Sequence, residues 1–135
     1  MVTPSAFEYR AAAVGLTVPV LREVIYAFYY EKVRQDAVLA PIFVQALGDK
    51  WDHHIEKVLL FWLTATGLGS GYQARNFLPA HVRHRSIGAA ELSRWLALFE
   101  ETLNQRCSPE VSEVLLDIAR RMAENIQIGI SRQTS

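Results

Sequence analysis

The sequence is poor in cysteine, in net charge and in long apolar runs, and each shortage excludes a class of protein. Cys107 is the single cysteine among 135 residues, which excludes an internal disulfide and a thiolate metal cluster and favours a reducing, cytoplasmic location. Fourteen basic residues balance fourteen acidic ones, which disfavours nucleic acid and anionic membranes as partners. The apolar run at residues 58–65 is far shorter than the roughly 20 residues of a membrane-spanning helix, so we expect a soluble protein.

Sequence motifs of several common enzyme classes are also missing. The chain has no glycine-rich phosphate loop, no G-x-S-x-G nucleophile turn and no H-E-x-x-H zinc helix. Aromatic rings are abundant instead, with three Trp, five Tyr, six Phe and four His in a chain that is 50% hydrophobic and 21% charged. This balance predicts a folded protein with one domain over residues 1–135, in which residues 1–15 form a frayed extension.

Apolar residues recur three and four positions apart along most of the chain, which predicts an all-α fold of five or six helices. We expect helices over residues 18–36, 50–66, a short part of 72–88, from 89 to at least 103, and 109–130. Thr17, Asp49 and Ser108 are the expected N-caps of three of them. Pro41 disfavours the helical conformation of the residue before it, which predicts a short turn that closes at Gly48.

Two histidines in the irregular segment, His81 and His84, are three positions apart, a spacing compatible with metal binding. No neighbouring cysteine or carboxylate completes a zinc shell, and by themselves both histidines are expected at the surface or in ordinary hydrogen bonds. Aromatic faces on three separate helices favour a different interpretation. A haem needs one imidazole on its iron, an apolar slot for its ring and a polar group on the opposite face, and this chain can supply all three.

Several stretches of the chain match one protein family in order and separation. They are FYYEKVRQD at residues 28–36, LAPIF at 39–43, WDHH at 51–54 with FW at 61–62, His81, and WLALFEET at 95–102. The region that they span, residues 16–130, resembles the truncated haemoglobins, and within that family the third group of small bacterial globins. The resemblance implies a globin-like, two-over-two helical sandwich around haem b.

The resemblance also implies roles for individual residues. His81, fourteen positions before Trp95, corresponds to the proximal ligand of the haem iron, and His84 does not. Tyr30 and Trp95 correspond to distal hydrogen-bond donors, His54 to the residue at the distal gate, and Val58 to a residue that faces the iron. A hydroxyl and an indole N–H in an apolar cavity would stabilise the negative charge on bound oxygen.

Further residues are expected to line or back the haem pocket. They are Tyr29, Ile42, Phe43, Phe61, Trp62, Tyr72, Arg83, Ile87 and Leu92. Hydrophobicity places Ile87 and Leu92 on the proximal wall, and Arg83 is either a partner of the haem propionates or a solvated surface charge. Phe28 and Phe99 are expected to be ordinary core residues.

Three functions are compatible with this interpretation. The first is a haem globin that binds oxygen and other diatomic ligands reversibly. The second is a redox enzyme on the same haem, a nitric oxide dioxygenase or a peroxidase-like protein, which would need an external reductase as a partner. The third is a haem-free helical interaction module that has kept the globin shell, for which we expect a collapsed pocket.

Overall fold

The computed structural model describes residues 13–68 and 88–134 of the chain, and Thr17 precedes the first helix that lies wholly within them. This helix is α2 (Val18–Ala27); the Thr17 hydroxyl accepts the Val20 N–H at 3.4 Å, and Pro19 lies in the first turn. The expected N-cap is therefore confirmed.

The expected continuous α-helix to Asp36 is wrong, because the chain changes its helical geometry after Ala27. Phe28–Val33 form a π-helical turn, η1, in which the Arg34 N–H donates to the Tyr29 carbonyl oxygen at 2.9 Å. A π-helical turn holds more residues than an α-helical one, so it changes the direction in which the following side chains point. Phe28, Tyr29 and Val33 are buried in this turn.

The predicted turn at residues 40–48 is also wrong, because α3 (Leu39–Leu47) occupies this segment. Pro41 lies in the first turn of α3, where the missing N–H would have no partner within the helix. Gly48 ends the helix with a φ of 59°. Pro41 therefore marks the beginning of a helix and not the break in helical structure that the sequence predicts.

The second long helix, α4 (Trp51–Thr66), ends at the predicted residue, and Gly67 follows in the left-handed conformation. Its N-cap is Lys50 rather than the expected Asp49, because the Lys50 carbonyl oxygen accepts the first intrahelical bond from the His54 N–H at 3.1 Å. The predicted short helix and loop at residues 72–88 lie outside the described residues, apart from Gly88.

The last two helices, α6 (Ala89–Arg106) and α7 (Pro109–Thr134), confirm the amphipathic pattern of the C-terminal part of the chain. The Ser108 hydroxyl accepts the Val111 N–H at 3.3 Å, as expected for the N-cap of α7. Helix α7 extends to Thr134, slightly beyond the expected end near residue 130.

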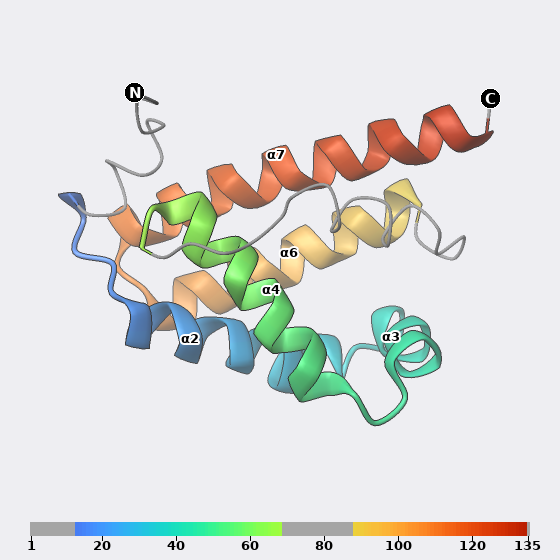
Figure 1. Cartoon of the computed structure of the whole chain (residues 1–135), viewed down its shortest axis with the longest axis horizontal. Helices are drawn as coiled ribbons and strands as arrows, with labels where there is room; N and C mark the ends of the chain where they lie inside the picture. Colours follow the sequence, from blue (N-terminus) through green and yellow to red (C-terminus); the bar gives the residue numbers. More distant parts are fainter. Residues whose placement is uncertain (1–12, 69–87, 135) are drawn as a thin grey trace.

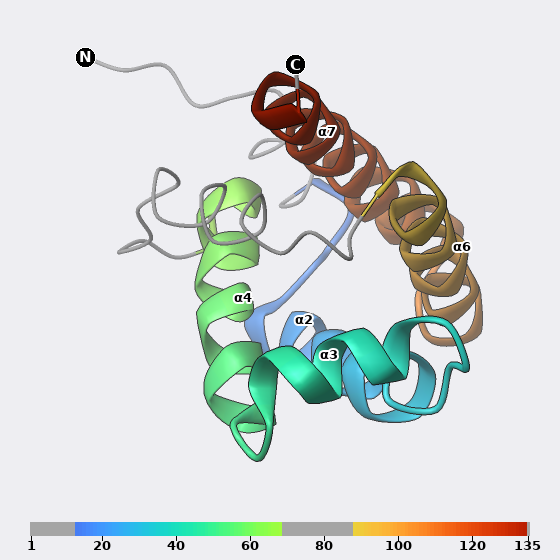
Figure 2. The ribbon, with the colours of Figure 1, turned by 90° about the vertical axis from the view of Figure 1, so that its right-hand side faces the viewer.

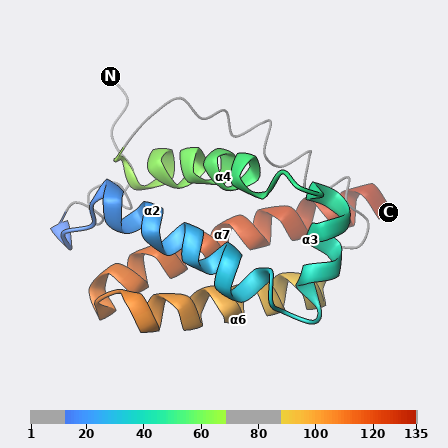
Figure 3. The ribbon, with the colours of Figure 1, turned by 90° about the horizontal axis from the view of Figure 1, so that it is seen from below.

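The helices form two antiparallel pairs, which is the two-over-two arrangement. Helices α6 and α7 lie side by side in opposite directions (Figure 1), and α2 and η1 pack along α4 (Figure 3). Arg22 bonds Glu56 while Tyr30, further along, bonds the earlier Asp52, as antiparallel packing requires. Helix α3 crosses one end of the molecule between α4 and α6 (Figure 2). Among the described residues all regular structure is helical, and no helix there is long and apolar enough to cross a membrane.

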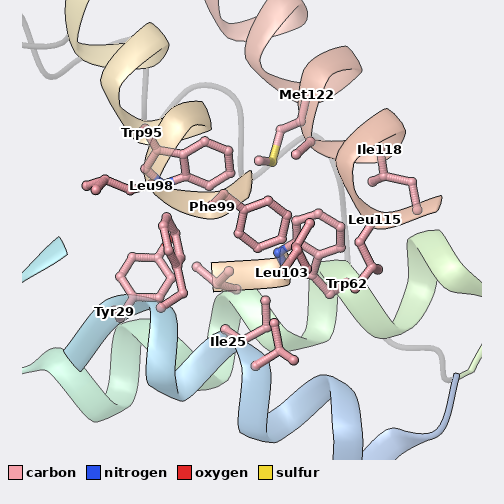
Figure 4. Packing of buried hydrophobic residues seen from close by; sticks show 14 of the residues in the cluster. Ile25, Tyr29, Trp62, Trp95, Leu98, Phe99, Leu103, Leu115, Ile118 and Met122 are labelled. Carbon is pink, nitrogen blue, oxygen red and sulfur yellow. The ribbon is translucent and has the colours of Figure 1, made fainter. Parts of the chain in front are cut away.

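Aromatic rings fill the core where the two helix pairs meet (Figure 4). Phe99 is fully buried and lies between two tryptophans, with its ring centroid 5.5 Å from Trp95 and 5.2 Å from Trp62, and both pairs are stacked. Phe28 packs its ring against Phe99 edge-on at 5.1 Å. Phe28 and Phe99 are therefore core residues, as expected, and their rings connect η1 to α6.

Candidate functional site

A narrow cavity with an interior volume of about 30 Å³ lies where η1, α3 and α4 face α6 and α7. Its lining is predominantly apolar and comes from all five elements. The lining residues are Tyr29, Leu39, Ile42, Phe43, Val58, Glu91, Leu92, Trp95, Met122, Ala123 and Ile126. Concave, mostly apolar linings with a few polar groups are typical of binding sites for cofactors.

Tyr29 supplies a hydroxyl group to this cavity from η1. Its side chain is 3% exposed, and burial raises the pKa of the hydroxyl, an effect that a hydrogen-bonding interaction with the Trp95 side chain partly offsets. The hydroxyl therefore stays protonated at physiological pH and can act as a hydrogen-bond donor inside the cavity.

Trp95 supplies a second polar group, an indole N–H, from α6. Its ring is 8% exposed, stacks on Phe99 with an interplanar angle of 13°, and meets the edge of Phe28 at 5.3 Å between centroids. Contacts with two buried rings restrict the rotamers of the indole. The cavity wall at Trp95 is therefore preorganised by the core.

His54 lies at the edge of the cavity on α4, one helical turn before Val58, which lines it. The half-buried imidazole is 5.4 Å from the Tyr29 ring and 6.1 Å from the Phe43 ring, and both contacts are edge-on. The structure therefore brings His54 together with Tyr29 and Phe43, beside the cavity, as a gate residue would require.

Tyr30 has a different environment from its neighbour Tyr29. Its hydroxyl donates to the Asp52 carboxylate of α4, which raises the pKa of that hydroxyl, and the Arg34 guanidinium lies 5.3 Å from the centre of its ring. Tyr30 also stacks on Tyr26 on the outer side of α2. The structure thus does not bring the predicted distal donor Tyr30 to the cavity lining, because the π-helical turn directs Tyr29 there.

The other predicted pocket residues divide into three sets. Tyr29, Ile42, Phe43, Val58, Leu92 and Trp95 line the cavity as expected. Trp62 instead lies in the core, fully buried against Phe99, and the half-buried Phe61 contacts the Trp62 ring at 5.5 Å, so both lie behind the lining. His81, Tyr72, Arg83 and Ile87 lie outside the described residues.

Sequence reasoning missed five lining residues: Leu39, Glu91, Met122, Ala123 and Ile126. Met122 and Ile126 are four positions apart on the apolar face of α7, so the 3.6-residue period is a usable signal for both. Glu91 is the charged member of the lining, and its carboxylate accepts the Gly88 N–H at 2.8 Å at the beginning of α6. Because Glu91 is charged, the spacing of apolar residues does not identify it as a lining residue.

The described lining fits one side of a haem. Its lining is mostly apolar, as the faces of a flat ring require, and Tyr29 and Trp95 add a hydroxyl and an indole N–H. Three or more His, Cys, Asp or Glu residues placed to hold a metal ion do not occur together within residues 13–68 and 88–134.

Comparison with known proteins gives the same interpretation. The chain is 35% identical, over 102 residues, to the group 3 truncated haemoglobin ctb of Campylobacter jejuni, a match that covers 73% of this chain and 80% of that protein. The crystal structure of the group III truncated haemoglobin from Campylobacter jejuni superimposes with a TM-score of 0.77 at 30% identity, over 85% of this chain and 91% of that one. No protein-family model matches the sequence. On the strength of these two similarities and the two-over-two fold, the chain belongs to the group 3 truncated haemoglobins.

Proposed function

We propose that this protein binds haem b and, through it, oxygen and other diatomic ligands reversibly. The observation that carries this proposal is the apolar cavity with Tyr29 and Trp95 in its lining, in a chain that belongs to a haemoglobin family. A bound haem would supply a ferrous iron, to which such ligands bind.

His81 is the proposed proximal ligand, on the basis of the family resemblance and its separation from Trp95. A single neutral imidazole is sufficient to hold a haem iron on one side. Leu92, at the beginning of α6, is the proposed proximal wall residue that the structure describes in the cavity lining. Tyr72, Arg83 and Ile87 complete the proposed haem contacts, with Arg83 as a partner of the propionates.

On the distal side, Trp95 and a tyrosine hydroxyl are the proposed donors to the ligand. The resemblance assigns the tyrosine role to Tyr30, which could reach a ligand only after its bond to Asp52 is broken. The hydroxyl of Tyr29 needs no such rearrangement because its side chain already lines the cavity. We therefore assign the tyrosine donor role to Tyr29, with His54 as the gate and Val58 as the wall.

A redox enzyme on the same haem is the second candidate, and the convergence of Tyr29, Trp95 and His54 at one edge of the cavity favours it. Hydrogen bonds from these groups would also suit the activation of peroxide or the oxidation of nitric oxide to nitrate. Such an enzyme needs an external reductase as a partner. We propose a cytoplasmic location for this chain, and the reductase would have to be in the same compartment. Rapid-mixing turnover with nitric oxide or peroxide separates the enzyme from the carrier.

The absorption spectrum of the purified protein tests the proposal directly. After addition of hemin, reduction and exposure to carbon monoxide, we expect a Soret band of a haem–carbon monoxide complex. We expect His81→Ala to abolish the normal five-coordinate ferrous spectrum, whereas the matched variant His84→Ala leaves it unchanged. A protein without a Soret band would overturn the haem proposal, and a loss confined to His84→Ala would move the proximal ligand to His84.

A further inference from the structure

One buried carboxylate, that of Asp36, lies at the junction of three elements that build the cavity. Its side chain is 4% exposed, and it follows η1 and precedes α3. Carboxylates are rarely buried unless they are paired and hydrogen-bonded, because desolvation penalises the charge. The position of Asp36 therefore needs a specific set of partners.

Asp36 has those partners on two different helices. One carboxylate oxygen, Oδ2, accepts the backbone N–H groups of Val38 at 3.1 Å and Leu39 at 3.0 Å, at the beginning of α3. The other, Oδ1, accepts Nε of Arg94 at 2.9 Å and Nη2 of Arg94 at 2.6 Å, from α6. Four donors thus converge on one carboxylate, which both caps α3 and binds α6.

The Arg94 guanidinium holds the pKa of Asp36 below its usual range, and the N–H groups of Leu39 and Val38 act in the same direction. These interactions outweigh the opposing effect of burial on the same carboxyl group. Asp36 is therefore ionised at neutral pH, and both of its contacts are charge-assisted.

Both contacts lead directly to the cavity wall. Arg94 immediately precedes Trp95, and the capped end of α3 contains the lining residue Leu39, with Phe43 one turn later. A shift of α6 at Arg94 would move the Trp95 indole, and a shift of the beginning of α3 would move the apolar wall. The Asp36 carboxylate therefore connects α3 and α6, the two helices that carry this part of the cavity wall.

We propose that Asp36 and Arg94 form a positioning pair that fixes α3 and α6 relative to each other and so sets the distance from Trp95 to the ligand. The effect on the ligand rests on the haem function proposed above, whereas the effect on α3 does not. The pair is distinct from the Lys32–Glu101 ion pair, which also joins η1 to α6. The pairs differ in the exposure of the carboxylate, because the Glu101 side chain is 52% exposed and that of Asp36 is 4% exposed, while Arg94 itself is 48% exposed. Ion pairs between exposed groups contribute little to stability.

The test compares Asp36→Asn with the matched control Glu101→Gln, because each converts to a carboxamide the carboxylate of an ion pair that involves α6. In the haem-free protein, we expect Asp36→Asn to increase amide hydrogen exchange of α3 about tenfold, while Glu101→Gln changes it less than about twofold. Arg94→Lys keeps the charge but not the two-pronged geometry, and we expect an intermediate increase.

The haem-loaded carbon monoxide complex gives a second signature that a purely structural role would not move. We expect its C–O stretching band to be single in the unchanged protein and in Glu101→Gln, and to broaden or split in Asp36→Asn, because Trp95 then occupies more than one position. If Asp36→Asn does not fold, Arg94→Lys provides both measurements. Unchanged α3 exchange and an unchanged band, or equal effects of Glu101→Gln, would overturn the pair. A missing Soret band contradicts the haem function alone, and α3 exchange then decides the positioning role.

Discussion

Tyr29 and Tyr30 are neighbours in the chain, yet they belong to two different regions of the molecule. Tyr29 lies on the inner side of η1, buried against the rings of Phe28, Phe43 and His54. Tyr30 lies on the outer side, where Asp52 accepts its hydroxyl and Arg34 covers its ring. Adjacent residues therefore place one hydroxyl, that of Tyr29, in an apolar cavity and the other, that of Tyr30, among charged side chains.

The two regions hold the same helices together by different forces. The inner side depends on the burial of large rings, which contributes in proportion to the area removed from water and hardly depends on salt. The outer side depends on Tyr–carboxylate and Arg–carboxylate contacts, such as Tyr26 and Arg22 with Glu56, and exposure weakens these. We therefore expect substitutions on the inner side to change stability and ligand chemistry, and those on the outer side to have small, salt-dependent effects.

Phe28→Ala should produce the largest effect. Phe28 is fully buried and its ring meets Tyr29, Trp95 and Phe99, so truncation leaves a cavity at the centre of the core. We expect a loss of about 3–5 kcal/mol in the free energy of unfolding, measured by denaturant titration. The control Tyr30→Ala, two residues away on the outer side, should lose much less. Similar losses in the two variants would contradict the division into an inner and an outer side.

The paired variants Tyr29→Phe and Tyr30→Phe should produce the next largest difference. Each removes one hydroxyl and keeps the ring, so the two changes are chemically identical. In the haem-loaded protein we expect Tyr29→Phe to raise the oxygen dissociation rate by about one to two decades, since a hydrogen bond to a charged group contributes about 1.5–3 kcal/mol. Tyr30→Phe should change the rate less than about twofold.

The opposite result would assign the donor role to Tyr30. A large effect confined to Tyr30→Phe would mean that Tyr30 leaves Asp52 and turns inward when haem binds. In that case Asp52→Asn, which weakens the competing bond, should lower the oxygen dissociation rate. If neither phenylalanine variant changes the rate, the tyrosine donor is removed from the proposal, and Trp95 remains as the candidate donor.

Periodicity predicted much of this fold because most of its helices are amphipathic and have local caps. The bounds of α6, the end of α4 and the Thr17 and Ser108 caps follow from patterns within a few residues. The lining residues Phe43, Val58 and Trp95 followed from the family resemblance, because they belong to its matching stretches or lie at a fixed offset from them.

The failures have a common physical cause, which is that tertiary contacts decided between local alternatives. A 3.6-residue period cannot reveal the π-helical turn, which exchanges the expected roles of Tyr29 and Tyr30. Asp36 accepts the first N–H groups of α3 from two and three positions away, which is a local signal, but its other oxygen is held by Arg94, 58 positions away.

Glu56→Gln tests the outer side alone and should have the smallest effect. The Tyr26 hydroxyl, followed by the Arg22 guanidinium, lowers the pKa of the Glu56 carboxyl, so the folded state favours the ionised form. The resulting stability is present above the unfolded pKa of about 4.3 and is lost as the pH falls through the lowered pKa of the folded protein. Because the Glu56 side chain is 46% exposed, solvent screening reduces the contribution to less than about 0.5 kcal/mol.

We expect Glu56→Gln to be slightly less stable than the unchanged protein in neutral denaturant titrations, and equally stable once the pH lies below both pKa values. Tyr26→Phe is the control, because it removes the first of the two partners and should reproduce the salt-independent part of the loss. A deficit that persists unchanged in acid would mean that Glu56 contributes by packing, and the charge-based account of the outer side would then be wrong at this position.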